Sequence, residues 1–164
     1  LAQRAAAFGM RVIGTKRAPE PIAHVEHVYP PEETDEVLRA ADFLVILLPL
    51  TPQTRGLIDG RALGLMKPNA VLINVGRGPI VQEAALIEAL RTGGIAGAGL
   101  DVFDREPLPT DSPFYQMENV IVTPHVSGAS PTYLDRAIPL FCENLRRYVT
   151  GAPLLNVVDP ARGY

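Results

Sequence analysis

The chain has 164 residues, 47% of them hydrophobic, which suffices for one domain with a core and is too short for two complete domains. The formal net charge of -3 and the scattered Lys and Arg residues leave no basic field for nucleic acid or for an anionic membrane. The single cysteine, Cys142, permits no intrachain disulfide, argues against a cysteine-based metal site and indicates a reducing, cytoplasmic location. No apolar run approaches the ~18 residues that a membrane span requires, so we expect no membrane partner.

The first half of the chain alternates apolar segments with helix-like ones. A first helix is expected to end at Gly9, which can adopt the left-handed cap conformation, and Pro31 opens a second helix with acidic residues in its first turn. A continuous apolar strand stops at Pro49. In chain order, the sequence predicts a helix over residues 1–8, strands over 10–15 and 23–29, a helix over 31–41 and a strand over 42–49.

The second half repeats this alternation. One of its helices is amphipathic and turns Leu86, Ala89 and Leu90 inward, and the last helix contains Pro139, where we expect a bend. In chain order, the sequence predicts a helix over residues 59–66, a strand over 70–76, a helix over 81–92, strands over 97–102 and 119–124, and a helix over 132–149.

Strands that are apolar on both faces and separated by helices predict an α/β fold with a parallel sheet covered on both faces. Right-handed crossovers then give a doubly wound sheet, whose ligands bind beyond the carboxyl ends of the strands. The polar residues at those strand ends are therefore the candidates for a functional site.

The strand over 70–76 ends in the turn GRGPI, which contains Arg77 between two glycines. A phosphate loop needs several converging N–H groups, and Pro79 removes one of them. The turn is better interpreted as presenting the planar guanidinium of Arg77 to a carboxylate. Taken alone, an arginine at a strand end is more often part of a surface ion pair.

Two further polar residues follow later strands. His125 comes after the strand over 119–124, and Glu106 lies in a proline-stiffened loop after the strand over 97–102. A lone histidine at a strand end is usually structural, but a neighbouring carboxylate would favour its charged form and hold one tautomer. An imidazolium acid, a carboxylate that orients it and an arginine that anchors an acid make a site for proton transfer at a carbonyl. Hydride transfer from a nicotinamide would complete such a reaction.

Four motifs now give the sequence a family resemblance: LLPLTPQTRGLI, LMKPNAVLINVGRGPIV, AGLDVFDREPLP and NVIVTPHVSG. In order and spacing they resemble the D-isomer-specific 2-hydroxyacid dehydrogenases, from Phe8 almost to Tyr164. The resemblance implies a Rossmann-like fold in which Arg77 binds and polarises a 2-oxo acid, His125 donates and accepts the proton, and Glu106 supports His125.

The resemblance also implies a dinucleotide cofactor and a homodimer formed through the cofactor domain. Asp101 would orient the nicotinamide amide, and we expect the cofactor to contact Thr15, Lys16, Arg17, Leu48, Pro49, Leu50, Thr54, Val75, Gly76, Asp101 and Gly128. Where relatives often carry an aspartate for the ribose, this chain has Lys16 followed by Arg17, and the two cations favour NADP over NAD. The alternative is that both side chains are simply solvated. Gln82 replaces an acid that many relatives carry, and we expect it only to start a helix.

The family's first strand and glycine-rich loop are expected just upstream of Leu1 and are absent from the sequence. We therefore expect a fragment in which residues 1–133 form a truncated nucleotide-binding domain and residues 134–164 return to an absent substrate domain. Glu106 argues against the formate dehydrogenases, and the short C-terminal end favours glyoxylate or hydroxypyruvate reductases over the long phosphoglycerate dehydrogenases. Two alternatives stay open: a corepressor-like protein that binds the dinucleotide without turnover, and an inactive isolated fragment.

Overall fold

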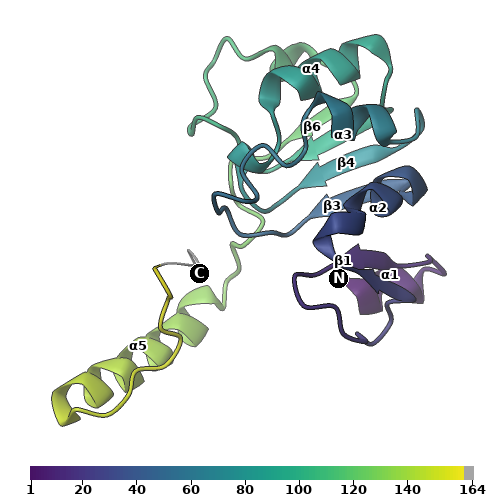
Figure 1. The fold of residues 1–164 in the computed structure, drawn as a ribbon. Coiled ribbons are helices and arrows are strands. Elements are labelled where there is room, and N and C mark those ends of the chain that lie inside the picture. Colours follow the sequence, from purple (N-terminus) through teal and green to yellow (C-terminus); the bar gives the residue numbers. More distant parts are fainter. Residues whose placement is uncertain (161–164) are drawn as a thin grey trace.

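A computed structural model describes residues 1–160, in which two parallel sheets are followed by a long helix that extends away from them (Figure 1). The strands are β1 (Ile13–Thr15), β2 (His27–Tyr29), β3 (Phe43–Ile46), β4 (Val71–Asn74), β5 (Gly97–Leu100) and β6 (Val120–Val122). The α-helices are α1 (Ala2–Ala7), α2 (Thr34–Ala40), α3 (Gly60–Leu65), α4 (Glu83–Thr92) and α5 (Tyr133–Thr150). Every predicted strand and helix is present, with bounds that differ by a few residues.

The larger sheet has the strand order β3-β4-β5-β6, and all of its ladders are parallel. Phe43 pairs with Val71, and Val71 pairs with Gly97, so side chains at equivalent positions share one face. Parallel strands that alternate with helices confirm the predicted α/β fold of the Rossmann-like type.

The expected doubly wound sheet, which lacks the family's first strand, is present in two parts, because β1 and β2 form a separate two-stranded parallel sheet. In the common doubly wound order, the first strand lies between the second and the fourth, which correspond here to β1 and β3. Residues 1–160 contain no strand at that place, so no ladder joins the two sheets. They are connected instead through α2, which contacts both β1 and α3.

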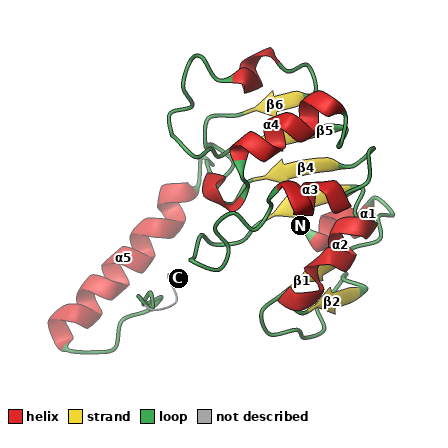
Figure 2. Ribbon diagram, turned by 45° about the horizontal axis from the view of Figure 1, so that its top comes forward, coloured by secondary structure: helices red, strands yellow, loops and turns green. Residues whose placement is uncertain are grey.

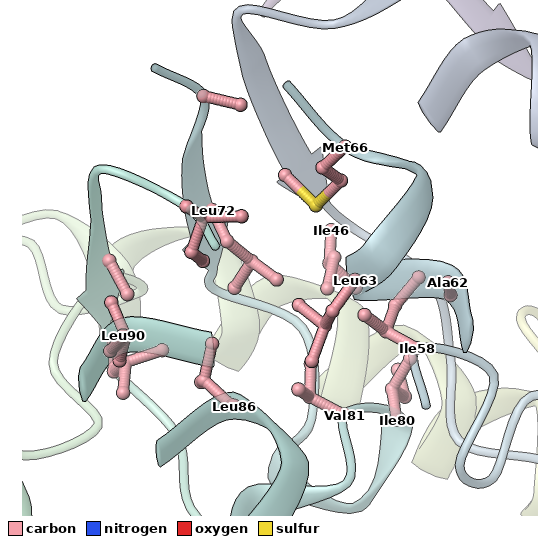
Figure 3. Packing of buried hydrophobic residues seen from close by; sticks show 14 of the residues in the cluster. Ile46, Ile58, Ala62, Leu63, Met66, Leu72, Ile80, Val81, Leu86 and Leu90 are labelled. Carbon is pink, nitrogen blue, oxygen red and sulfur yellow. The ribbon is translucent and has the colours of Figure 1, made fainter. Parts of the chain in front are cut away.

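Helices α2, α3 and α4 lie on one side of the sheets, and α1 lies on the opposite side of the small sheet (Figure 2). The core fills the space between the larger sheet and these three helices, where Ile46, Leu63, Leu72 and Leu86 belong to one buried cluster (Figure 3). Burial of each large side chain contributes about 1.5–3 kcal/mol, and this layer fixes β4 and β5 in place. On the other face of the larger sheet, 73% of Ile121 is exposed.

Local differences from the prediction have tertiary causes. The helix expected from Val81 begins at Glu83, because Val81 forms a parallel bridge with Ile58 and cannot also join the helix. Gln82 is the N-cap of α4, as expected, and Pro139 lies inside α5. Short 3-10 helices occupy η1 (Pro31–Glu33), η2 (Gly78–Ile80) and η3 (Pro113–Gln116). No helix within residues 1–160 is long and apolar enough to cross a membrane.

Candidate active site

The turns after β4, β5 and β6 carry the polar residues that the sequence singled out. Arg77 follows β4, Asp101 and Glu106 follow β5, and His125 follows β6. Because β4, β5 and β6 are adjacent and parallel, their carboxyl ends meet at one edge of the sheet. The fold therefore gathers at one edge side chains that are far apart in the sequence.

The turn after β4 exposes Arg77 between two buried glycines. The Nη1 atom of Arg77 donates a hydrogen bond of 2.7 Å to the carbonyl oxygen of Gly76. A Cβ atom on Gly78 would lie only 2.0 Å from the carbonyl carbon and oxygen of Phe103. Glycine is therefore required at position 78 by the close approach of the next strand's loop, and the turn is packed against that loop rather than open as a phosphate cradle.

His125 and Glu106 form a close pair across two strand ends. The Nδ1 atom of His125 lies 2.7 Å from Oε2 of Glu106, and Oε1 of Glu106 accepts a hydrogen bond of 3.0 Å from the Phe103 amide. Burial by itself would raise the pKa of Glu106, but hydrogen bonds from His125 and Phe103, together with the charges of His125 and Arg77, hold that pKa below its usual range. Glu106 is thus a carboxylate at neutral pH and fixes the orientation of the His125 ring.

Asp101 is 2% exposed and binds the loop that carries His125. Its Oδ1 atom accepts hydrogen bonds from the Thr123 hydroxyl (2.5 Å) and the Val126 amide (2.9 Å). Its Oδ2 atom accepts from the Ser127 amide at 2.9 Å. Burial would raise the pKa of Asp101, but these hydrogen bonds outweigh it and hold the pKa far below its usual range.

The His125 loop, which the Asp101 side chain binds, holds His125 in an uncommon backbone conformation, with φ at +55°. A non-glycine residue in the left-handed region persists only where its surroundings fix it. The family resemblance implies a role of Asp101 toward the nicotinamide, and that role stays a prediction. The structure adds a second role, because Asp101 and Thr123 hold the loop that positions His125.

The loop after β3 contains four of the expected cofactor contacts, namely Leu48, Pro49, Leu50 and Thr54. The Thr54 hydroxyl donates to the Pro49 carbonyl oxygen at 2.7 Å and accepts from the Thr51 amide at 2.8 Å, which folds the loop back on itself. A Cβ atom on Gly76 would lie 3.0 Å from the Leu48 carbonyl oxygen. The structure therefore brings this loop against Gly76, and contact of these residues with a cofactor stays a prediction.

The remaining expected contacts lie elsewhere. Thr15, Lys16 and Arg17 are at the end of β1 in the small sheet, where Lys16 forms an ion pair with Glu20. Gly128 is exposed in the loop between β6 and α5, and no atom lies within 4 Å of the position of a Cβ there. Within residues 1–160, no group of three or more His, Cys, Asp and Glu residues could hold a metal ion.

Two polar residues in the site did not stand out from the sequence. Asn74 is 1% exposed at the end of β4 and hydrogen-bonds the Arg77 turn, and Thr123 binds Asp101. An asparagine at the end of the apolar run AVLIN was a usable signal, because a buried amide requires hydrogen-bond partners. Thr123 gave no such signal, since threonine is common in strands.

Comparison with known proteins identifies the family of the chain. Residues 1–127 match the sequence profile of the family described as D-isomer specific 2-hydroxyacid dehydrogenase, NAD binding domain, and the chain belongs to this family. Glyoxylate/hydroxypyruvate reductase B from Yersinia pestis (strain Pestoides F) is 44% identical over 161 residues, which are 98% of this chain and 49% of that protein. The chain thus spans about half the length of the curated relatives it matches.

Solved structures show the same fold. The D-isomer specific 2-hydroxyacid dehydrogenase from Xanthobacter autotrophicus Py2, in complex with NADPH and MES, is 45% identical, with a TM-score of 0.92 over 99% of this chain and 66% of that chain. The NADPH-dependent glyoxylate/hydroxypyruvate reductase from Sinorhizobium meliloti, in complex with NADP and sulfate, is 41% identical, with a TM-score of 0.90 over 99% of this chain and 52% of that chain.

Proposed function

We propose that the natural full-length protein reduces a 2-oxo acid to its D-2-hydroxy acid with NAD(P)H. The observation that carries this proposal is the 2.7 Å contact between His125 and Glu106 at the sheet edge that also exposes Arg77. Such a set suits proton transfer at the carbonyl of an anionic substrate. The names of the relatives support glyoxylate and hydroxypyruvate as the substrates to test first.

Each residue has a distinct part in this proposal. The guanidinium of Arg77 binds the substrate carboxylate and polarises the carbonyl group. The Nε2 atom of His125, opposite the nitrogen that contacts Glu106, gives its proton to the carbonyl oxygen and takes it back in the reverse direction. Glu106 stabilises the imidazolium and fixes the tautomer of the neutral His125 ring. A nicotinamide cofactor, when bound, would supply or receive the hydride at the carbonyl carbon.

Substitution of His125 tests the proposal. In the natural full-length protein, His125→Ala is expected to lower kcat/KM for glyoxylate or hydroxypyruvate by about 10²- to 10⁴-fold, the usual contribution of a general acid. The matched control is His27→Ala, which removes an imidazole that contacts the Tyr29 ring edge-to-face in the small sheet. Dinucleotide binding without turnover of any 2-oxo acid would overturn the proposal and favour a corepressor-like protein.

The residues present fit a phosphorylated dinucleotide. Lys16 and Arg17 place cations after β1. The loop that follows β3, with Leu48 and Pro49, contacts the turn that follows β4 at Gly76. We propose that Lys16 and Arg17 receive the 2'-phosphate and that the protein prefers NADPH to NADH. The double variant Lys16→Ala/Arg17→Ala should raise the KM for NADPH by about tenfold or more and leave that for NADH within about twofold. Equal Michaelis constants for the two cofactors in the unmodified protein would contradict the preference.

We propose, in addition, that residues 1–133 hold the dinucleotide and that α5 leads back to a substrate domain. The evidence for this is an apolar stripe along α5, where Leu134, Ile138, Phe141 and Leu145 are each more than half exposed. Residues 161–164, the end of the predicted second segment, lie outside the described residues. A cytoplasmic homodimer, formed through residues 1–133, completes the proposal, and sedimentation of the natural protein would test the dimer.

A further inference from the structure

Asn74 is a buried polar residue that the proposed chemistry does not use. It ends β4 and is 1% exposed, although its neighbours along the strand are apolar. A buried side-chain amide costs free energy unless its polar atoms are hydrogen-bonded, and an apolar β-branched residue would suit a strand better. The presence of an amide here therefore calls for a specific explanation.

Both polar atoms of the Asn74 amide bind the turn that presents Arg77. The Oδ1 atom accepts a hydrogen bond of 3.1 Å from the Gly76 amide, and the Nδ2 atom donates one of 3.1 Å to the Arg77 carbonyl oxygen. The Gly76 amide belongs to the peptide between Val75 and Gly76, and the Arg77 carbonyl oxygen belongs to the peptide that follows the Arg77 α-carbon. The side chain of Asn74 thus binds both ends of the two-residue segment, Gly76 and Arg77, from which the Arg77 side chain extends.

The backbone around Asn74 is itself held by the sheet. The Asn74 carbonyl oxygen accepts a hydrogen bond of 3.0 Å from the Asp101 amide, and the Val75 amide donates one of 3.4 Å to the Ile46 carbonyl oxygen. The Asn74 side chain therefore extends from a segment anchored to both neighbouring strands. Its hydrogen bonds therefore fix the Arg77 turn relative to the sheet.

Other contacts of the turn do not replace this amide. The Arg77 carbonyl oxygen also accepts a longer bond of 3.3 Å from the Ile80 amide, within the same turn. The Arg77 guanidinium bonds to the Gly76 carbonyl oxygen, which moves together with the turn. Gly76 and Gly78 give the backbone freedom that other residues would not. Without Asn74, no side chain of the described residues hydrogen-bonds to the Arg77 backbone.

We propose that Asn74 is the positioning residue for Arg77 and sets the direction in which the guanidinium meets the substrate carboxylate. The inference rests on the proposed function, in which Arg77 binds the 2-oxo acid. A misplacement of about 1 Å costs up to about 100-fold in rate, so loss of the amide is costly even if Arg77 is still present. Asn74 acts through Arg77 and touches no reacting atom.

The test uses the natural full-length protein and glyoxylate or hydroxypyruvate. Asn74→Asp keeps the size of the side chain but replaces its donor with an acceptor facing the Arg77 carbonyl oxygen, and Asn74→Ala removes both bonds. Each is expected to lower kcat/KM by about 10- to 100-fold, with KM raised, while the Kd of the dinucleotide stays within about threefold. Asn74→Ser keeps a hydroxyl for one bond and should show a smaller loss, which provides a second variant if the others fail to fold.

The matched control is Asn119→Ala. Asn119 also binds two backbone groups through its amide, the carbonyl oxygens of Leu90 and Ala96 at 3.3 Å each, but it lies away from the Arg77 turn. We expect unchanged KM in this variant. A purely structural role of Asn74 would lower kcat in proportion to the folded fraction and leave KM unchanged, as for any partly unfolded enzyme, and that result would overturn the inference.

A double-mutant cycle separates this inference from the proposed function. If Asn74 acts through Arg77, Asn74→Ala has no further effect on kcat/KM in an Arg77→Ala background. If Arg77→Ala lowers kcat/KM and Asn74→Ala lowers it further by its full amount in that background, the positioning role of Asn74 is overturned. The proposed function of Arg77 would then still stand. Unchanged turnover in Arg77→Ala would overturn the proposed function of Arg77 and the inference with it.

Discussion

At the scale of single residues, two carboxylates after β5 have different surroundings. Glu106 is partly exposed and contacts the His125 ring, whereas Asp101 is buried and binds the backbone of the His125 loop. Both have a lowered pKa, because hydrogen-bond donors converge on each of them. One carboxylate therefore orients the imidazole directly, and the other fixes the backbone that carries it.

The Asp101 hydrogen bonds predict a pH-dependent stability. Since the folded pKa lies below the unfolded value of about 4, the contribution of this carboxylate is fully present above about pH 4 and is lost as the pH falls through the folded pKa. Asp101→Asn leaves an amide facing three donors and should cost about 1–3 kcal/mol at neutral pH. Urea unfolding should show that the difference in unfolding free energy between this variant and the unmodified protein is constant from about pH 6 to 8 and becomes smaller below about pH 4.

The control for this measurement is Asp111→Asn, which changes an exposed carboxylate in the loop that leads to η3. It should alter the unfolding free energy by less than about 0.5 kcal/mol at any of these pH values. An Asp101→Asn protein as stable as the unmodified protein at neutral pH would show that the three hydrogen bonds contribute nothing to the loop.

At the scale of elements, the site depends on how closely neighbouring strand ends approach one another. The Gly78 backbone packs directly against the Phe103 carbonyl, and the Phe103 amide binds Glu106. The Arg77 turn and the Glu106 loop are therefore in contact through backbone atoms. A change in the spacing of β4 and β5 would move both functional side chains together.

Gly78→Ala tests this contact. The added Cβ would lie 2.0 Å from backbone atoms of Phe103, which no side-chain movement can relieve. We expect a loss of about 1–3 kcal/mol in the unfolding free energy and reduced turnover in the natural full-length protein. Thermal denaturation and steady-state kinetics measure the two effects.

The matched control is Gly64→Ala in α3, where no atom lies within 4 Å of the added Cβ. Alanine in a helix is favoured over glycine, so this variant should be unchanged or more stable by up to about 1 kcal/mol. If the two alanine variants had equal stability, the close packing of Gly78 against Phe103 would be refuted.

At the scale of the whole molecule, much apolar surface is left uncovered. The stripe along α5 includes Phe141, of which 67% is exposed, and the uncovered face of the larger sheet includes Ile121. Large contiguous apolar patches are rare on monomeric proteins. The described chain thus has a well-packed core on one side of the larger sheet and surfaces on α5 and the other side that require a partner or a further segment.

This surface predicts association of residues 1–164 when they are expressed alone. Phe141→Ser/Leu145→Ser should shift the chain toward monomer in sedimentation experiments, because it removes the centre of the apolar stripe on α5. The control Asp135→Ser/Arg136→Ser changes charged residues on the same helix without changing its net charge, and it should associate like the unmodified chain. Equal association of both double variants would mean that α5 is not the contact surface.

The element order and the α/β class could be predicted from the sequence alone, because strand and helix formation follow local hydrophobic periodicity. It also placed Arg77, Glu106 and His125 at strand ends, since Gly and Pro mark those ends. The resemblance to the family and the presence of Lys16 after the first predicted strand led to the cofactor prediction. All of these are properties of short segments, which a sequence displays directly.

The contacts between segments are visible only in the folded structure. It showed that the sheet is divided between β1 and β3, that Val81 pairs with Ile58 instead of starting α4, and that Asp101 binds the His125 loop. It also showed the two hydrogen bonds through which Asn74 holds the Arg77 turn. These contacts could not be predicted from the sequence. Each depends on the distance between atoms of different segments, or on which groups hydrogen-bond to a buried amide, and local periodicity encodes neither.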